Sequence, residues 1–303
     1  MLRQDIGAVM SLSSKEEIIV VDKRSLWSPM NAIEAVRAHL REVLTENLSP
    51  DCAAFLSGLL LGFSEPLSAP LSNDLRKTGT AHFLAISGFH LVLVGAGLWI
   101  FLVIAGVRGR KQPLWLLCFL GFYTLLTGLP VSVVRSFIMA AVYLLGDFLW
   151  RKKDGPNTLA FSALIILLVD PGQLFSAGFQ LTYLAVLGII FITPVIYGFF
   201  GVERAEGRGI AASVVFRILK YLAFSLSVSF AAWLATAPIV ASQFHLVTPV
   251  ILIANLFIAP FMLMAILVGF LLLILGSISG TLAAPVAFII DPLFHLLRVV
   301  ADF

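Results

Sequence analysis

Two histidines, a serine and a glycine lie within nine residues of an otherwise apolar stretch. They are His82, Ser87, Gly88 and His90, and the apolar run continues to Val107. Ionisable groups at membrane depth cost roughly 2.5–3.5 kcal/mol each, so they usually face a protein interior or a water-filled path. Gly88 allows a helix to break, and a break frees backbone groups to line a cavity. We therefore expect this stretch to form the wall of a pathway, with Ser87 and Gly88 at its narrow part.

Further polar residues lie in or just before other apolar segments. Arg76 and Lys77 precede the histidine segment, and Arg135, Gln180, Thr182 and Asn255 lie inside later ones. In the orientation derived below, all but Asn255 fall in the outer half of the membrane. The basic members and the two histidines would make an outward-facing vestibule positive, and such a field attracts a polyanion.

Each of these residues also has a structural explanation. Arg135 can extend its guanidinium to the outer headgroups, since it is near the end of its segment. His82 can serve as an interhelical hydrogen-bonding group, and Ser87 can bond back to its own helix. Gln180 and Asn255 can link helices through hydrogen bonds worth about 0.6 kcal/mol each.

The sequence gives little support to catalysis. Ser87 and His90 invite comparison with an intramembrane serine protease, but Ala85-Ile86-Ser87-Gly88 lacks the Gly-x-Ser-Gly pattern of the rhomboid enzymes. A His-Glu-x-x-His zinc motif and a Walker sequence are both absent from the chain. We expect a protein that is not an enzyme and that uses no metal and no cofactor.

Composition identifies the class of protein that positions these residues. Hydrophobic residues make up 60% of the 303 residues and charged residues only 12%, with a mean hydropathy of +1.02. Soluble domains carry about 25% charged residues. The expected fold is all-α, a polytopic transmembrane helical bundle. Its candidate membrane segments are 52–63, 80–107, 113–129, 131–149, 157–169, 174–200, 218–242, 247–276 and 281–303.

Not every segment is expected to be a simple crossing. Residues 52–63 and 157–169 would rise only about 18–20 Å as helices, so we interpret them as re-entrant or discontinuous pieces. Pro260 is expected to bend the segment 247–276.

The chain divides into a short tail and one membrane domain. Residues 1–27 lack the apolar region of a signal peptide, and we interpret them as a tail or the remnant of a missing domain. Residues 28–303 form the membrane domain. Within it, 28–48 is predicted to be an amphipathic helix in the membrane interface, with Arg37 and Arg41 facing away from its apolar stripe. A soluble helix packed on a neighbouring domain is the alternative.

Basic residues set the predicted orientation. Ten of them fall in three regions separated from one another by two segments each: Arg108, Arg110, Lys111, Arg151, Lys152, Lys153, Arg204, Arg208, Arg217 and Lys220. The positive-inside rule makes this side cytoplasmic. Only Arg76 and Lys77 break the rule, and a substrate arriving from outside would meet them first.

Several motifs at compatible spacing resemble the ComEC competence family. Residues 75–90 read L-R-K-T-G-T-A-H-F-L-A-I-S-G-F-H, and residues 128–139 read G-L-P-V-S-V-V-R-S-F-I-M. Asn157-Thr158-Leu159-Ala160, Asp170-Pro171 and Gly178-Phe179-Gln180-Leu181-Thr182 follow in order. Ser136 stands where this family usually has alanine, and Thr182 where it has serine. The similarity runs from about residue 30 to the C-terminus.

The resemblance implies a multi-pass channel in the bacterial inner membrane that carries single-stranded DNA inward during natural transformation. Members of this family usually carry an OB-like domain before this region and a metallo-β-lactamase-like domain after it. Residues 1–27 are too few for the first, and we expect no nuclease in this polypeptide. The expected partners are single-stranded DNA, the lipid bilayer, and separately encoded competence proteins or a nuclease. A secondary transporter for a smaller anion and a non-conducting membrane scaffold remain the alternatives.

Overall fold

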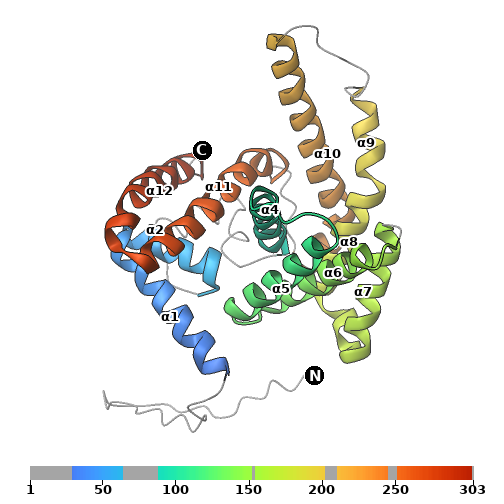
Figure 1. The fold of residues 1–303 in the computed structure, drawn as a ribbon. Helices are drawn as coiled ribbons and strands as arrows, with labels where there is room; N and C mark the ends of the chain where they lie inside the picture. Colours follow the sequence, from blue (N-terminus) through green and yellow to red (C-terminus); the bar gives the residue numbers. More distant parts are fainter. Residues whose placement is uncertain (1–28, 64–87, 152–153, 202–209, 245–250, 302–303) are drawn as a thin grey trace, which may run out of the picture.

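The computed structural model describes residues 29–63, 88–151, 154–201, 210–244 and 251–301, and every regular element in these ranges is helical (Figure 1). The all-α prediction is therefore confirmed. The elements are α1 (Pro29–Asn47), α2 (Pro50–Leu56), the π-helical turn η1 (Ser57–Leu61), α4 (Gly88–Ile104), α5 (Lys111–Leu126), α6 (Val131–Phe148), α7 (Gly155–Val169), the 3-10 turn η3 (Pro171–Phe175), α8 (Ala177–Phe191), α9 (Thr193–Phe199), α10 (Ile210–Phe244), α11 (Ile251–Ile278) and α12 (Gly280–Ala301).

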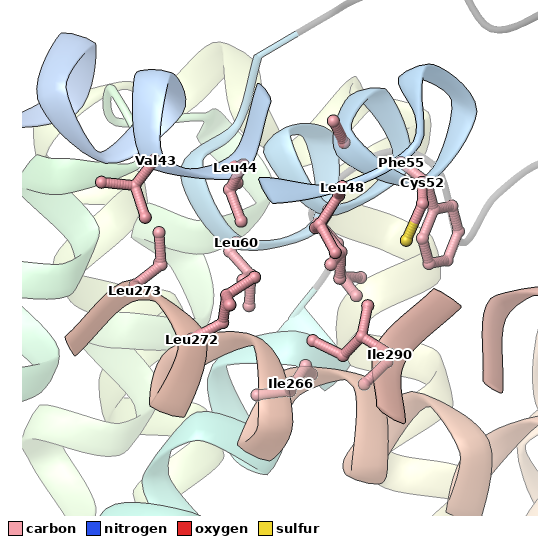
Figure 2. Close-up of a cluster of buried hydrophobic side chains, with 14 of the residues drawn as sticks. Val43, Leu44, Leu48, Cys52, Phe55, Leu60, Ile266, Leu272, Leu273 and Ile290 are labelled. Carbon is pink, nitrogen blue, oxygen red and sulfur yellow. The ribbon is translucent and has the colours of Figure 1, made fainter. Parts of the chain in front are cut away.

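The largest apolar core among the described residues joins the first described helices to the last two. It is built from α1, α2, η1, α11 and α12, which lie together on one side of the molecule in Figure 1. Figure 2 shows Val43 and Leu44 of α1 pointing toward Leu272 and Leu273 of α11. At the break between α1 and α2, the Ser49 hydroxyl donates a hydrogen bond of 2.9 Å to the Asp291 carboxylate of α12.

Helix α1 agrees with the predicted amphipathic helix in its extent. Its two arginines, predicted to face away from the apolar stripe, both lie over the Phe63 ring, with the Arg41 guanidinium 5.3 Å from the ring centre. Val43 and Leu44 are buried in the core, as the apolar stripe predicts. Arg37, however, does not face away: its Nη2 donates to the Leu61 carbonyl at 3.1 Å, and its guanidinium lies 4.6 Å from the centre of the Phe63 ring. The C-terminal end of η1 supplies the carbonyl group that attracts this cation. Whether α1 also lies in the membrane interface stays a prediction.

Two smaller apolar clusters pack the helices in the middle of the chain against one another. Leu91 of α4 packs with Leu120 of α5 and Val133 of α6, and a second cluster joins α7 to α8. Helix α8 also packs closely on α10. At Gly188, a Cβ atom would lie 2.6 Å from both the Ala231 carbonyl oxygen and the Ala235 Cβ. Such small residues let membrane helices approach each other closely.

Three described helices are long and apolar enough to cross a membrane: Val131–Phe148, Ser213–Gln243 and Pro260–Ile278. A fourth crossing arises if Ala177–Phe191 and Thr193–Phe199 form one span, bent by 41°. Pro50–Leu61, Gly88–Ile104, Gly155–Val169 and Gly280–Phe294 are shorter apolar helices. The two segments predicted to be too short for a full crossing are indeed short, whereas the prediction of nine membrane segments exceeds the spans that meet this length test.

Candidate functional site

An open cavity of about 800 Å³ lies between α4, α5, α6, α7 and α8. Most of its surface is apolar, and its polar lining includes Ser136, Thr158 and Thr182. The residues that line it carry no formal charge. Phe89 and Tyr143 place aromatic rings on its wall.

Gly88 lies on this wall at a close approach of α4 to α6. A Cβ atom on Gly88 would collide with the Ser136 Oγ and would lie 3.2 Å from the Ser136 Cβ. The described part of α4 begins at Gly88, and the residues before it lie outside the described ranges. The structure therefore assigns Gly88 a packing role that the sequence did not indicate, while the predicted helix break at Ser87-Gly88 stays a prediction.

Arg135 is buried against the first turn of α8. Its side chain is only 8% exposed, so the alternative in which it extends to the outer headgroups is wrong. A Cβ atom on Gly178 would lie 2.9 Å from Nη2 and 3.2 Å from Nη1 of Arg135. The absence of a side chain at Gly178 thus makes room for the guanidinium. The motif at residues 128–139, which contains Arg135, and the motif that begins at Gly178 therefore lie in contact here.

Hydroxyl groups from α7 and α8 lie in contact with each other. The hydroxyls of Ser162 and Tyr183 are 3.1 Å apart, and the Tyr183 and Phe179 ring centres are 4.3 Å apart. The sequence did not indicate Ser162 and Tyr183 as site residues, and it marked Ser136 only as a departure from the family's usual alanine. For Tyr183 a signal existed, because a tyrosine inside an apolar helix usually has a hydrogen-bond partner for its hydroxyl.

The described candidate residues do not all converge on the cavity. Gly88 and Thr182 line it, and Thr182 donates a hydrogen bond of 2.7 Å to the Gly178 carbonyl. Arg135 therefore lies about one helical turn from the cavity wall. His90 is completely buried but is not among the residues lining this cavity. Gln180 donates to the Leu174 carbonyl at 3.0 Å, which ties the start of α8 to η3.

The other candidates are not described by the structure. Arg76, Lys77, His82 and Ser87 lie outside the described ranges, and Asn255 is placed on α11 by its backbone alone. The positive vestibule thus stays a prediction. In the described part of the chain, no group of three His, Cys, Asp or Glu side chains is arranged to hold a metal ion.

A protein-family model described as Competence protein matches residues 59–303. The chain is 29% identical over 253 residues to ComE operon protein 3 of Bacillus subtilis (strain 168), which covers 82% of this chain and 30% of that protein. It is also 33% identical over 140 residues to the uncharacterized protein YcaI of Escherichia coli (strain K12), covering 43% of this chain and 19% of that one. The chain therefore spans less than a third of either relative. No solved structure matches the chain significantly.

Proposed function

The chain belongs to the competence protein family, and we propose that it forms a channel through which single-stranded DNA crosses the bacterial inner membrane during natural transformation. Apolar helices long enough to span a bilayer support a membrane location. The observation that carries the channel proposal is the cavity between α4 and α8. Gly88 and Thr182, from two separate motifs, lie on its wall.

A single strand needs two kinds of surface along its path. Phosphates are neutralised by basic groups, and bases stack on aromatic rings. Phe89 and Tyr143 offer rings at the cavity. Arg135 offers a cation about one turn from the wall, and Arg76 and Lys77 precede α4 in the sequence. The cavity's own lining is uncharged, so the phosphates depend on basic groups at its edges.

The test is to fill the cavity and measure transformation. Ala140 lines the cavity on α6, whereas Ala160 is exposed on α7 and does not line it. Ala140→Phe should lower transformation frequency at least tenfold at normal protein level, and Ala160→Phe should leave it unchanged. Transformation at the parental frequency in a strain that lacks the gene would overturn the proposal.

A transporter for a smaller solute is the second candidate. The cavity volume of about 800 Å³ falls within the range of small-molecule pockets, and its uncharged lining suits a weakly polar ligand. In that case loss of the gene would change uptake of a solute and leave transformation intact. Separately encoded competence proteins or a nuclease remain proposed partners.

A further inference from the structure

Arg135 and the first turn of α8 place two positive groups against each other. Helix N-termini carry a partial positive charge of roughly half an elementary charge, and their first backbone N–H groups have no acceptor within the helix. Arg135 brings a full positive charge to within contact distance of Gly178, the second residue of α8. Without an anion between them, this juxtaposition is electrostatically unfavourable.

The surrounding groups leave this charge uncompensated. Arg135 is more than nine-tenths buried, and its Nε has no hydrogen-bond partner among the described residues. No carboxylate among the described residues forms an ion pair with Arg135. Unpaired buried charges are costly, so such a group is expected to have a ligand.

The first turn of α8 also has backbone N–H groups that find no hydrogen-bond acceptor within the helix. The Ser176 hydroxyl accepts a hydrogen bond from the Phe179 amide at 3.2 Å, which satisfies one of the early N–H groups. The amides of Ala177 and Gly178 lie before it, where the helix provides no acceptor. Because Gly178 has no side chain, the Arg135 guanidinium lies directly against this backbone.

We propose that the Arg135 guanidinium and the Ala177 and Gly178 amides bind one phosphodiester anion of a single-stranded nucleic acid. A guanidinium presents two parallel donors to phosphate oxygens, and a helix N-terminus is a ready-made phosphate site. This assignment rests on the proposed function and names the contact at which the strand is held.

Location favours a strand over a phospholipid headgroup as the ligand. Arg135 is buried between α6 and α8 and does not face the outer surface of the bundle. Thr182 and Ser136, which line the cavity, lie one turn from Gly178 and next to Arg135 respectively. A strand that extends from the cavity by about one turn of α8 would therefore meet the guanidinium inside the bundle.

Binding of a fluorescein-labelled single-stranded oligonucleotide tests the site, with the full chain in nanodiscs of neutral lipid and salt concentration varied. Arg135→Gln should weaken binding about tenfold and flatten the slope of log affinity against log salt by about 0.7, the value for one lost contact on a single strand. Arg135→Lys should keep the slope and bind more weakly, because lysine lacks the planar fork. Gly178→Ala should weaken binding by displacing the guanidinium. Arg217→Gln, at an exposed position of α10, is the matched loss of charge and should bind as the parent does.

The outcomes separate this site from the proposed function. A parental protein that binds no oligonucleotide overturns both. Parental binding with unchanged slopes in Arg135→Gln and unchanged affinity in Gly178→Ala overturns the site alone, as does an equal loss in Arg217→Gln. A phospholipid retained by the parent and lost from Arg135→Gln in native mass spectrometry, with oligonucleotide binding intact, would assign the site to a headgroup instead. If Arg135→Gln fails to fold, Arg135→Lys and Gly178→Ala carry the test.

Discussion

Arg110 donates a hydrogen bond of 3.3 Å from Nε to the backbone carbonyl of Phe148, and its guanidinium lies 4.7 Å from the centre of the Phe148 ring. Arg110 belongs to the loop between α4 and α5, whereas Phe148 ends α6, three residues before Arg151. The contact places the two basic loops on the same side of the bundle. This arrangement agrees with the orientation derived from the positive-inside rule.

Cysteine labelling should find both loops in the cytoplasm. In a protein without its native cysteines, single cysteines at Arg108, Arg151 or Lys152 should react with a membrane-impermeant maleimide only after the cells are permeabilised. A cysteine at Gly172, in the turn before α8, should react in intact cells. Labelling of Arg108→Cys and Arg151→Cys on opposite sides would contradict the contact. Labelling of both in intact cells would invert the topology and the outer vestibule with it.

Gly88→Ala should lower transformation because its new methyl group collides with the Ser136 hydroxyl. The added Ser136→Ala change removes that hydroxyl and should restore most of the activity, since the remaining contact with the Ser136 Cβ is 3.2 Å. Gly88→Leu should abolish transformation in either background. Equal defects of Gly88→Ala with and without Ser136→Ala would show that the close approach of α4 to α6 is not what requires glycine.

Gly188→Ala should destabilise the pairing of α8 with α10. Its Cβ would lie 2.6 Å from a backbone oxygen, which cannot rotate away, so we expect a loss of about 1–3 kcal/mol in the free energy of unfolding. Gly198→Ala in α9, where nothing lies within 4 Å, is the control and should be neutral or slightly stabilising. Unfolding by sodium dodecyl sulfate in bicelles measures both. Equal stabilities of the two variants would contradict the tight packing.

Arg37→Leu should destabilise the protein by about 1–3 kcal/mol, because it removes the hydrogen bond to the Leu61 carbonyl and the contact with the Phe63 ring. His39→Leu, an exposed position on the same helix, should change the free energy of unfolding by less than about 0.5 kcal/mol. The same denaturation assay applies. An Arg37→Leu protein as stable as the parent would return Arg37 to the solvated face that the sequence predicted.

The helices could be predicted from the sequence more fully than the contacts of the candidate site. Long apolar runs and their turns predict helices such as α6 and α10, because backbone groups in a bilayer must bond within their own segment. Charge placement likewise indicates that the loops near Arg110 and Arg151 share a side.

Contacts between distant helices carry no such local signal. Gly88 reads as a helix breaker, and only the packing of α4 on α6 shows its contact with Ser136. The sequence indicates a vestibule residue at Arg135, with a headgroup contact as the alternative, and only the position of α8 shows why Gly178 must lack a side chain. Gln180 reads as a pathway residue, yet its amide completes the turn at Leu174.

Site-specific photocrosslinking in transforming cells tests the channel most directly. A benzoylphenylalanine at Phe89 or Val186, both on the cavity wall, is compared with one at the exposed Leu168 of α7. If the strand passes through the cavity, the two wall positions will crosslink to labelled incoming DNA and Leu168 will not. Transformation at the parental rate without a crosslink at either wall position, or with equal crosslinking at Leu168, would contradict the account.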